Sequence, residues 1–266
     1  KEQFQEAFRK AREKTSSSPS GLHYTIWKAL AKNDWCAEFL CIMLSLPFVY
    51  GFVNNRWLRC IDVMLEKKPG VRKIHQLRII GLLEADFNTA LKFFFAHQMM
   101  IVAEENGLSD EQHGLRRHRS CTDAAMIKLL TFECARVKRS TIGETSYDAK
   151  SCFDRVERSQ NTMYSLKQNV DSNLLLARDL CIERMKRHVK TGMGVSIVTY
   201  CQRPGDARIG GKVQGKGDTP ALFTQESSIR LKAHAKVAPG LTMNSCTMKR
   251  KINHRSLCSR MIRRDM

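Results

Sequence analysis

The segment Ala85–Asn106 constrains the fold more than any other part of the chain. It contains neither Gly nor Pro and is rich in Leu, Phe, Met and Ala, which predicts a long helix. Gly107 follows where helices commonly end. A second helix is predicted to begin after Ser120, because Asp123 completes a capping-box pattern, and to run to about Val137. Both helices are expected to form core, since stripes of aromatic and Met side chains usually pack.

Shorter segments predict a mixed architecture around these helices. Apolar spacing predicts a helix over 2–14, and Asp34 can cap another that runs to about Leu46 and ends at Pro47. Further along the chain, β-branched, Thr-rich or Gly-rich stretches predict strands with helices between them. The expected strands are Thr141–Tyr147, Val195–Tyr200 and Arg208–Val213, and the expected helices cover 156–168, 172–187 and 220–236. This order predicts a helical N-terminal part followed by an α+β part.

The charge of the chain restricts its partners. Lys and Arg number 45 against 26 Asp and Glu, a formal net charge of +19. Such an excess attracts polyanions at long range, so nucleic acid is the first candidate partner and an anionic membrane surface the second. Residues 184–266 hold 18 basic and four acidic residues, so most of the excess is C-terminal. Membrane association is not expected, because no long basic amphipathic face with clustered Trp and Leu is present.

The cysteines and the apolar runs indicate an intracellular protein, in the nucleus or the cytoplasm. The ten cysteines are scattered and form no Cys-x-x-Cys pair, which favours reduced thiols and argues against a zinc site. The longest apolar run, Phe39–Val53, is interrupted by Pro47 and is shorter than the ~20 residues that a bilayer requires. The first residues contain no apolar signal core.

The sharpest chemical signal is the segment Tyr147–Asp154, where a predicted strand gives way to a turn and a helix. A carboxylate at the end of a strand is well held and accessible, as binding of a hard cation such as Mg²⁺ requires. Asp148 is therefore a candidate metal ligand. The alternative is that Asp148 or Asp154 only caps the following helix.

A second signal is the Gly-rich basic loop Val213–Phe223, which precedes a predicted helix. Close backbone approach and the dipole of a helix N-terminus favour a phosphate or a nucleotide at such a loop. The alternative is an ordinary helix-entry turn, for which Gly and Pro suffice. The Gly-Lys-Ser/Thr order of a P-loop is absent, so a P-loop ATPase fits poorly.

Taken in order, five short motifs resemble the reverse transcriptase domain of non-LTR, LINE-like retrotransposons. In such domains a Lys-Pro-Gly turn, a Leu-Arg-x-Ile strand, a Gln-x-Gly segment ending in Arg-Ser, an Asp-x-x-x-x-Phe-Asp motif and a Gln-Gly-x-x-x-Ser/Thr-Pro motif follow one another. The corresponding segments here are Lys67–Gly70, Leu77–Ile80, Gln112–Ser120, Asp148–Asp154 and Gln214–Pro220. The stretches Thr15–Gly21 and Arg56–Trp57 also look like the region ahead of the fingers motifs, so the resemblance covers most of residues 1–245.

The resemblance implies roles for individual residues. Asp148 would be the catalytic residue that binds Mg²⁺, or Mn²⁺, in a site with two metal ions ~4 Å apart. Phe153 matches the aromatic residue that packs on the sugar, although it could equally be a core residue. Arg78 matches the fingers arginine that pairs with the incoming triphosphate, where a planar guanidinium suits phosphate oxygens.

The loop and the remaining cations complete the implied site. Gln214 and Gly215 match the loop beneath the nucleotide and the template base, where Gly permits close approach. Lys67, Lys68 and Lys216 are expected to contact the nucleic-acid backbone without reading its sequence. For Lys67 and Lys68 a solvated run of charge is an equal alternative.

One motif of the family has no counterpart in the chain. The family has a Phe/Tyr-x-Asp-Asp turn that supplies the remaining carboxylates, whereas the only acids after Phe223 are Glu226 and Asp265. The chain is therefore expected to be a truncated or decayed copy. A frame change near Lys249 is one explanation for the missing turn.

The expected fold is α+β, of the right-hand polymerase type, with helical fingers and a partial palm that contains a small antiparallel sheet. Residues 1–140 would form the fingers-like helical region, 141–245 the partial palm and 246–266 a basic divergent tail. The expected function is RNA-directed DNA polymerisation on an RNA template and a DNA primer with deoxynucleoside triphosphates. The alternatives are a non-catalytic basic nucleic-acid-binding fragment and a structural helical protein whose motif matches are chance.

Overall fold

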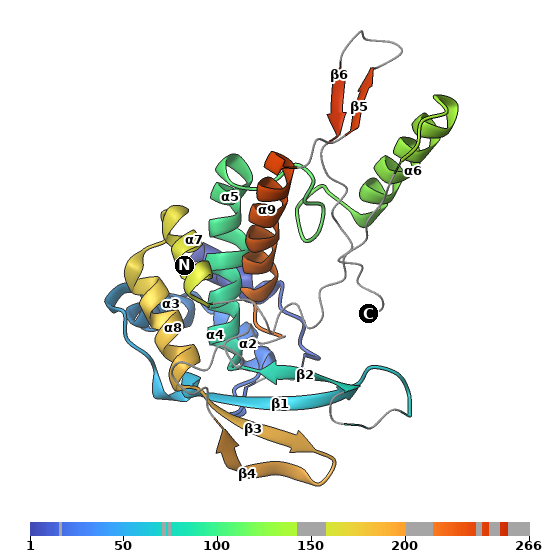
Figure 1. Cartoon of the computed structure of the whole chain (residues 1–266). Coiled ribbons are helices and arrows are strands. Elements are labelled where there is room, and N and C mark those ends of the chain that lie inside the picture. The colour runs from blue at the N-terminus through green and yellow to red at the C-terminus, as the bar shows by residue number, and fades with distance from the viewer. Residues whose placement is uncertain are drawn as a thin grey trace. The chain divides into compact units, whose positions relative to one another are not determined.

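The computed structural model describes residues 1–15, 18–70, 73, 76–142, 158–200, 215–237, 241–244 and 251–254. The chain forms two compact units, one of Lys1–Ile101 with Cys152–Thr219 and one of Val102–Ser151 with Pro220–Met266. In chain order (Figure 1) the elements are α1 (Glu2–Arg9), α2 (Tyr24–Ala31), α3 (Asp34–Tyr50), η1 (Asn55–Leu58), β1 (Arg59–Glu66), β2 (Leu77–Leu82), α4 (Ala85–Leu91), η3 (Lys92–Met99), α5 (Met100–Asn106), α6 (Cys121–Val137), α7 (Arg158–Lys167), α8 (Ser172–Arg184), β3 (Lys186–Thr191), β4 (Gly194–Tyr200), α9 (Thr219–Val237), β5 (Leu241–Asn244) and β6 (Lys251–His254).

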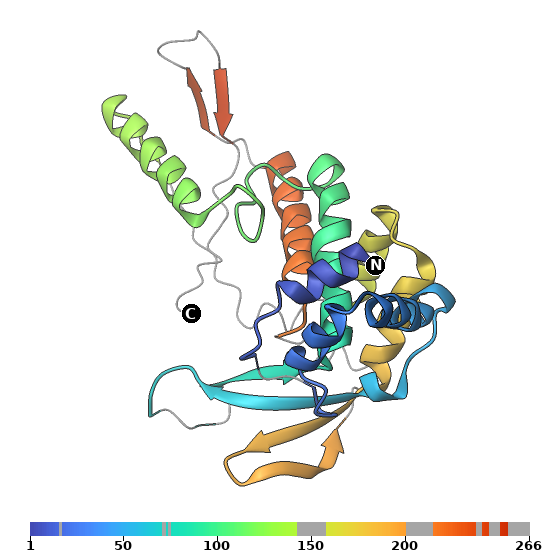
Figure 2. The same ribbon diagram turned by 180° about the vertical axis from the view of Figure 1, so that it is seen from behind.

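The first unit is built on a four-stranded sheet with the order β2-β1-β3-β4. Strand β1 pairs antiparallel with β2 and parallel with β3, and β3 pairs antiparallel with β4. An α+β fold was predicted correctly, but the sheet is mixed rather than antiparallel. Parallel neighbours need a long crossover connection, and the chain between β1 and β3 supplies it with helices. Strand β4 is an outer edge, farthest from α2 and α4 in both views (Figures 1 and 2).

The sheet takes β1 and β2 from the region expected to be fingers, and β3 and β4 from the region expected to be palm. The division of the chain into fingers, palm and tail stays a prediction. Of the expected strands, Val195–Tyr200 is confirmed as β4, whereas most of Thr141–Tyr147 and all of Arg208–Val213 lie outside the described residues. Strands β1, β3, β5 and β6 and helix α2 were not predicted.

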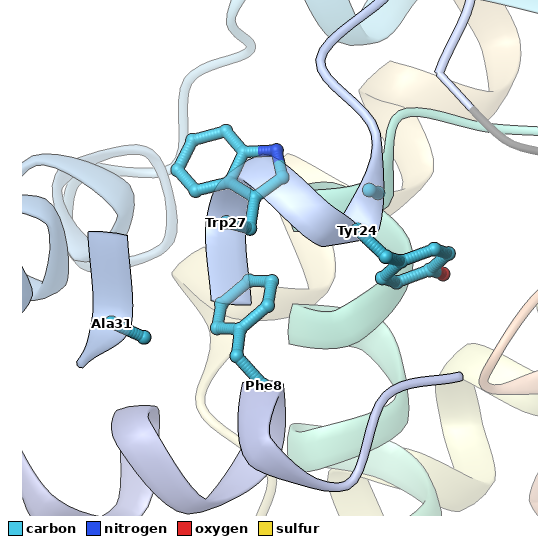
Figure 3. Packing of buried hydrophobic residues seen from close by; sticks show 5 residues of the cluster. Phe8, Tyr24, Trp27 and Ala31 are labelled. Atoms are coloured by element: carbon cyan, nitrogen blue, oxygen red, sulfur yellow. The ribbon is translucent and has the colours of Figure 1, made fainter. Parts of the chain in front are cut away.

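An aromatic cluster joins the first two helices to the start of α4. Phe8, Trp27 and Ala85 are almost completely buried, and the ring centroids of Phe8 and Trp27 are 5.8 Å apart. Figure 3 shows Phe8 beneath Trp27, with Tyr24 and Ala31 on either side. Helix α1 ends at Arg9, earlier than predicted, once its apolar residues have reached this cluster.

Helix α3 continues through Pro47 to Tyr50, so the prediction that Pro47 ends the helix was wrong. A proline inside a helix removes one backbone hydrogen bond. Packing offsets this loss, because the adjacent Phe48 is buried with ring centroids 5.4 Å from Trp57 and 5.1 Å from Phe94. The helix ends instead at Gly51, whose φ of 69° is typical of a left-handed C-cap.

The helices predicted from caps and composition are present, but Asn33 and not Asp34 caps α3, by accepting from the Cys36 N–H at 3.0 Å. Helix α6 was expected to form core, yet only Thr131 and Ala135 of it are buried, and Leu129 and Leu130 are exposed. The segment Ala85–Asn106 is helical throughout, although η3 within it is a π-helix. Ser120 and Asp123 form the predicted capping box of α6, with the Asp123 N–H donating to Ser120 Oγ at 3.1 Å. Helices α7 and α9 lie where they were expected. Helix α8 stops three residues early, since Met185 is extended and β3 follows.

Candidate functional site

The Gly-rich loop of residues 215–219, called the glycine loop below, packs against β2 as closely as van der Waals contact permits. Gly215 has a φ of +104°, which side chains rarely adopt, and a Cβ there would lie 2.8 Å from Gly81 O and 3.1 Å from Ile80 Cγ2. Only glycine fits such a position without displacing the backbone. The structure thus brings the loop of one predicted motif against the strand of another, although more than a hundred residues separate them in the chain.

Helix α4 holds the other side of this loop. The Gly217 N–H donates to Asn88 Oδ1 at 2.6 Å, and Asn88 Nδ2 donates to Gly215 O at 3.4 Å. A Cβ on Gly217 would lie 2.6 Å from Asn88 O and 2.8 Å from Lys92 Cβ. The loop therefore fits between the end of β2 and the first turns of the helix that follows it.

Arg78 lies on the strand that the loop contacts. Arg78 and Ile80 are two residues apart in β2, and such residues project from the same face of a strand. Since Ile80 touches the loop at Gly215, Arg78 emerges on the same face of the strand, about 6–7 Å further along it. Its guanidinium is half-buried and has no hydrogen-bond or ion-pair partner among the described residues. Its donors are available to a ligand.

Other unpaired cations share the face of the sheet that carries Arg78. Arg78 pairs with Leu65 of β1, and the alternation of β1 places Arg59 on that face. The parallel pairing with β3 adds Lys186 and Lys190. Arg59, Lys186 and Lys190 are exposed and, like Arg78, have no partner within the described part of the chain. We call these four residues the basic face. No carboxylate of the described strands lies on it.

A buried polar cluster occupies the opposite face of the sheet. Asp62 of β1 is fully buried and accepts hydrogen bonds from Arg187 Nη2 at 2.6 Å and from the Tyr200 hydroxyl. These contacts tie β1 to β3 and β4. Burial raises the pKa of Tyr200 to about 12 and that of the neighbouring Cys60 thiol to about 12. The cluster buries the middle of β1 on this face, whereas Arg59, Lys186 and Lys190 of the basic face are exposed.

Lys216 does not lie on the surface. Its side chain is 4% exposed and its Nζ lies 3.1 Å from Asp218 Oδ2, which is fully buried. Burial lowers the pKa of Lys216 below its ordinary value, and Asp218 opposes this shift. A buried, paired ammonium does not face a polyanion, so the expected backbone contact of Lys216 finds no support in its placement. Lys67 and Lys68, by contrast, are exposed in the turn after β1.

The segments that contain Ser20 and Arg56–Trp57 contact two carboxylates, Glu84 and Asp86, at the start of α4. Ser20 donates from its N–H and its hydroxyl to the two carboxylate oxygens of Glu84, at 2.9 and 2.8 Å. Arg56 Nη1 donates to Glu84 at 2.7 Å and to Asp86 at 3.1 Å, while Trp57 Nε1 donates to Asp86 at 3.0 Å. Each oxygen of these buried carboxylates has a donor, so they are structural and not free to bind a cation.

The Gln-x-Gly segment belongs to the second unit. There Gln112 Nε2 donates to Gly114 O at 3.4 Å, and the Thr224 hydroxyl of α9 donates to the same carbonyl at 3.3 Å. Arg116 bonds to Glu104 and to the carbonyls of Ser109 and Gln112. These contacts order the segment and leave its arginine occupied.

Asp148, Phe153, Asp154 and Gln214 lie outside the described residues, so their expected roles remain predictions. Among the residues that the structure describes, no group of three His, Cys, Asp or Glu side chains could hold a metal ion. The described part of the chain therefore brings no three such side chains together. None of its helices is long and apolar enough to cross a membrane.

Sequence reasoning missed Asn88 and Asp62. A polar residue inside a helix pattern carries no signal of a partner elsewhere in the chain, which explains Asn88. Asp62 could have been suspected from its place between the apolar residues of β1, because a strand carboxylate on an inward face needs a partner.

The chain matches no protein-family model, and a search of the curated proteins finds no relative of it.

Proposed function

We propose that the chain is, by descent, a reverse transcriptase domain of the LINE-like type, with a right-hand polymerase architecture. Strands β1 and β2 would belong to its fingers, and β3 and β4 to its partial palm. Its ligands would be a deoxynucleoside triphosphate, an RNA template and a DNA primer. The observation that carries the proposal is the packing of Gly215 against Ile80 and Gly81, which brings the nucleotide loop to the strand that bears Arg78.

The geometry at this point suits a triphosphate. Gly215 and Gly217 have no side chains, so the loop backbone itself approaches the strand. The guanidinium of Arg78 has hydrogen-bond donors that no described residue uses. Charge-assisted hydrogen bonds from a guanidinium to phosphate oxygens are short and can be bidentate. The exposed Lys67 and Lys68 lie on the turn that connects β1 to β2 and extend the positive charge. Asp148 remains the proposed ligand of Mg²⁺, which would activate the primer hydroxyl when bound.

The basic face favours a second candidate, a nucleic-acid-binding protein without catalysis. Four cations on one face of the sheet, unpaired within the described residues, can neutralise phosphates whether or not a metal site exists. This candidate shares the nucleic-acid partner of the first and differs from it only in chemistry. It predicts binding that weakens steeply with salt and no incorporation of nucleotides.

Primer extension on an RNA template with Mg²⁺ or Mn²⁺ separates the two candidates. Incorporation that is lost in Asp148→Ala would support the polymerase, and salt-dependent binding without incorporation would support the second candidate. Absence of binding to a template–primer duplex even at ~50 mM salt would refute both, since each depends on phosphate contacts.

The role of Arg78 is tested by titration with a fluorescent deoxynucleoside triphosphate. Arg78→Ala is expected to weaken binding at least about tenfold, because a charge-assisted hydrogen bond contributes about 1.5–3 kcal/mol. Arg78→Lys should recover only part of the affinity, since an ammonium cannot bind two oxygens in a fixed fork. Arg12→Ala is the matched control, as Arg12 is an exposed arginine outside the sheet. Equal affinities of Arg78→Ala and Arg12→Ala would contradict the assigned role.

A further inference from the structure

We infer that Asn88 is a positioning residue that holds the glycine loop, residues 215–219, in its place beside β2. Asn88 lies in α4, and its side-chain amide bonds to the loop at two points. Oδ1 accepts from the Gly217 N–H at 2.6 Å, and Nδ2 donates to Gly215 O at 3.4 Å. The loop backbone presents one donor and one acceptor, and asparagine meets both with a single planar group.

A second partner, Tyr24, holds this amide from the other side. Asn88 Nδ2 also donates to the Tyr24 hydroxyl at 3.2 Å, and Tyr24 is 8% exposed. The Gly217 N–H can only donate and the Gly215 carbonyl can only accept, so a flipped amide would lose both bonds. Burial raises the pKa of Tyr24, which keeps its hydroxyl protonated at neutral pH. Tyr24 therefore supports the loop through Asn88 without touching it.

Tight packing leaves the loop little freedom to slide along the helix. A Cβ on Gly217 would lie 2.6 Å from the backbone oxygen of Asn88 and 2.9 Å from the backbone nitrogen of Lys92. Within the loop, the Thr219 N–H donates to Lys216 O at 3.3 Å and Lys216 pairs with Asp218. The loop is thus a compact turn, and the side chain of Asn88 bonds to its backbone from outside.

The consequence for ligand binding rests on the proposed function. If residues 215–219 form the floor of a nucleotide site, loss of the Asn88 amide should weaken triphosphate binding although Asn88 is not itself a ligand. The effect should be smaller than that of Arg78→Ala, because the loop can still reach its bound position after paying an ordering cost.

Hydrogen exchange of the loop amides tests the inference without any ligand. In Asn88→Ala we expect the Gly217 amide to exchange about three- to tenfold faster, as loss of one hydrogen bond implies. Asn88→Asp retains the acceptor for the Gly217 N–H, so it should keep most of this protection, while its carboxylate repels Gly215 O. Ala90→Gly is the matched control, because it weakens the same helix by about 1 kcal/mol and removes no side-chain hydrogen bond.

The outcomes separate the inference from the proposed function. Unchanged exchange at residues 215–219 in Asn88→Ala would overturn the inference, and so would equal acceleration in Ala90→Gly, which would indicate a general loosening of α4. Faster loop exchange together with weaker binding of a fluorescent deoxynucleoside triphosphate is the expected result. Faster loop exchange in a protein whose wild type binds no triphosphate would support the role of Asn88 and contradict the proposed function.

Discussion

Replacement of Gly215 by alanine should destabilise the first unit more than the same change at Gly21. Both glycines have positive φ, +104° and +86°, so both substitutions incur a backbone cost of about 1–3 kcal/mol. Only at Gly215 does the new Cβ meet neighbours, 2.8 Å from the backbone oxygen of Gly81, whereas nothing lies within 4 Å at Gly21. Overpacking of this kind adds about 1–3 kcal/mol. The difference between the two variants therefore reports the clash alone.

Urea unfolding followed by tryptophan fluorescence measures this difference. All three tryptophans, Trp27, Trp35 and Trp57, lie in the first unit, so the signal reports the unit that holds the loop. Gly215→Ala is expected to lose about 1–3 kcal/mol more of unfolding free energy than Gly21→Ala. If the protein avoids the clash by releasing the loop, amide exchange at residues 216–219 will rise instead. Equal stability losses with unchanged exchange would show that the loop does not pack on β2.

The remaining predictions concern the sheet. Asp62→Ala should lower the free energy of unfolding, measured in urea, by about 3–5 kcal/mol, because it leaves the guanidinium of Arg187 buried without its partner. The double variant Asp62→Ala/Arg187→Ala should recover part of this loss. Additive effects of the two substitutions would contradict the pairing. The pKa of Tyr200 is raised from 10.0 to about 12, so its contribution to stability should be present below pH 10 and be lost as the pH rises to about 12. In Tyr200→Phe this loss of unfolding free energy between pH 10 and 12 should be absent. Cys60 and Cys181, whose thiol pKa values are raised by burial to about 12, should resist alkylation by iodoacetamide at pH 8 in the folded protein, as peptide mapping by mass spectrometry can verify.

Local signals in the sequence predicted most of the helices and the strand β4, but not α2. The capping box at Ser120, the Gly/Pro-free run of Ala85–Asn106 and the β-branched residues of β4 each depend on interactions within a few residues, so the prediction needed no knowledge of the fold. Pro47 misled because the cost of one lost hydrogen bond is local, whereas the packing of Phe48 that offsets it comes from segments far along the chain.

The strands that were missed depend on tertiary contacts. Strand β3, Lys186–Thr191, is too polar to resemble a strand, and it forms because β1 and β4 pair with it on both sides. For the candidate site, motif order indicated Arg78 and Gly215, and the structure adds that their segments touch. The burial of Lys216 could not be predicted, since a lysine in a Gly-rich loop looks solvent-exposed until its partner Asp218 is seen to be buried with it.

The outer edge of β4 sets a condition for handling the protein. Among the described strands none pairs with the outer side of β4, its residues Gly194–Tyr200 carry no charge, and Ile197 is 96% exposed. Such an edge is a template for pairing with a strand of another molecule. Like-charge repulsion between chains of net charge +19 opposes this contact at low ionic strength, and salt shortens its range to about 3 Å at 1 M. Concentrated salt, which many purification schemes use to strip nucleic acid from basic proteins, is therefore the condition under which this chain should precipitate.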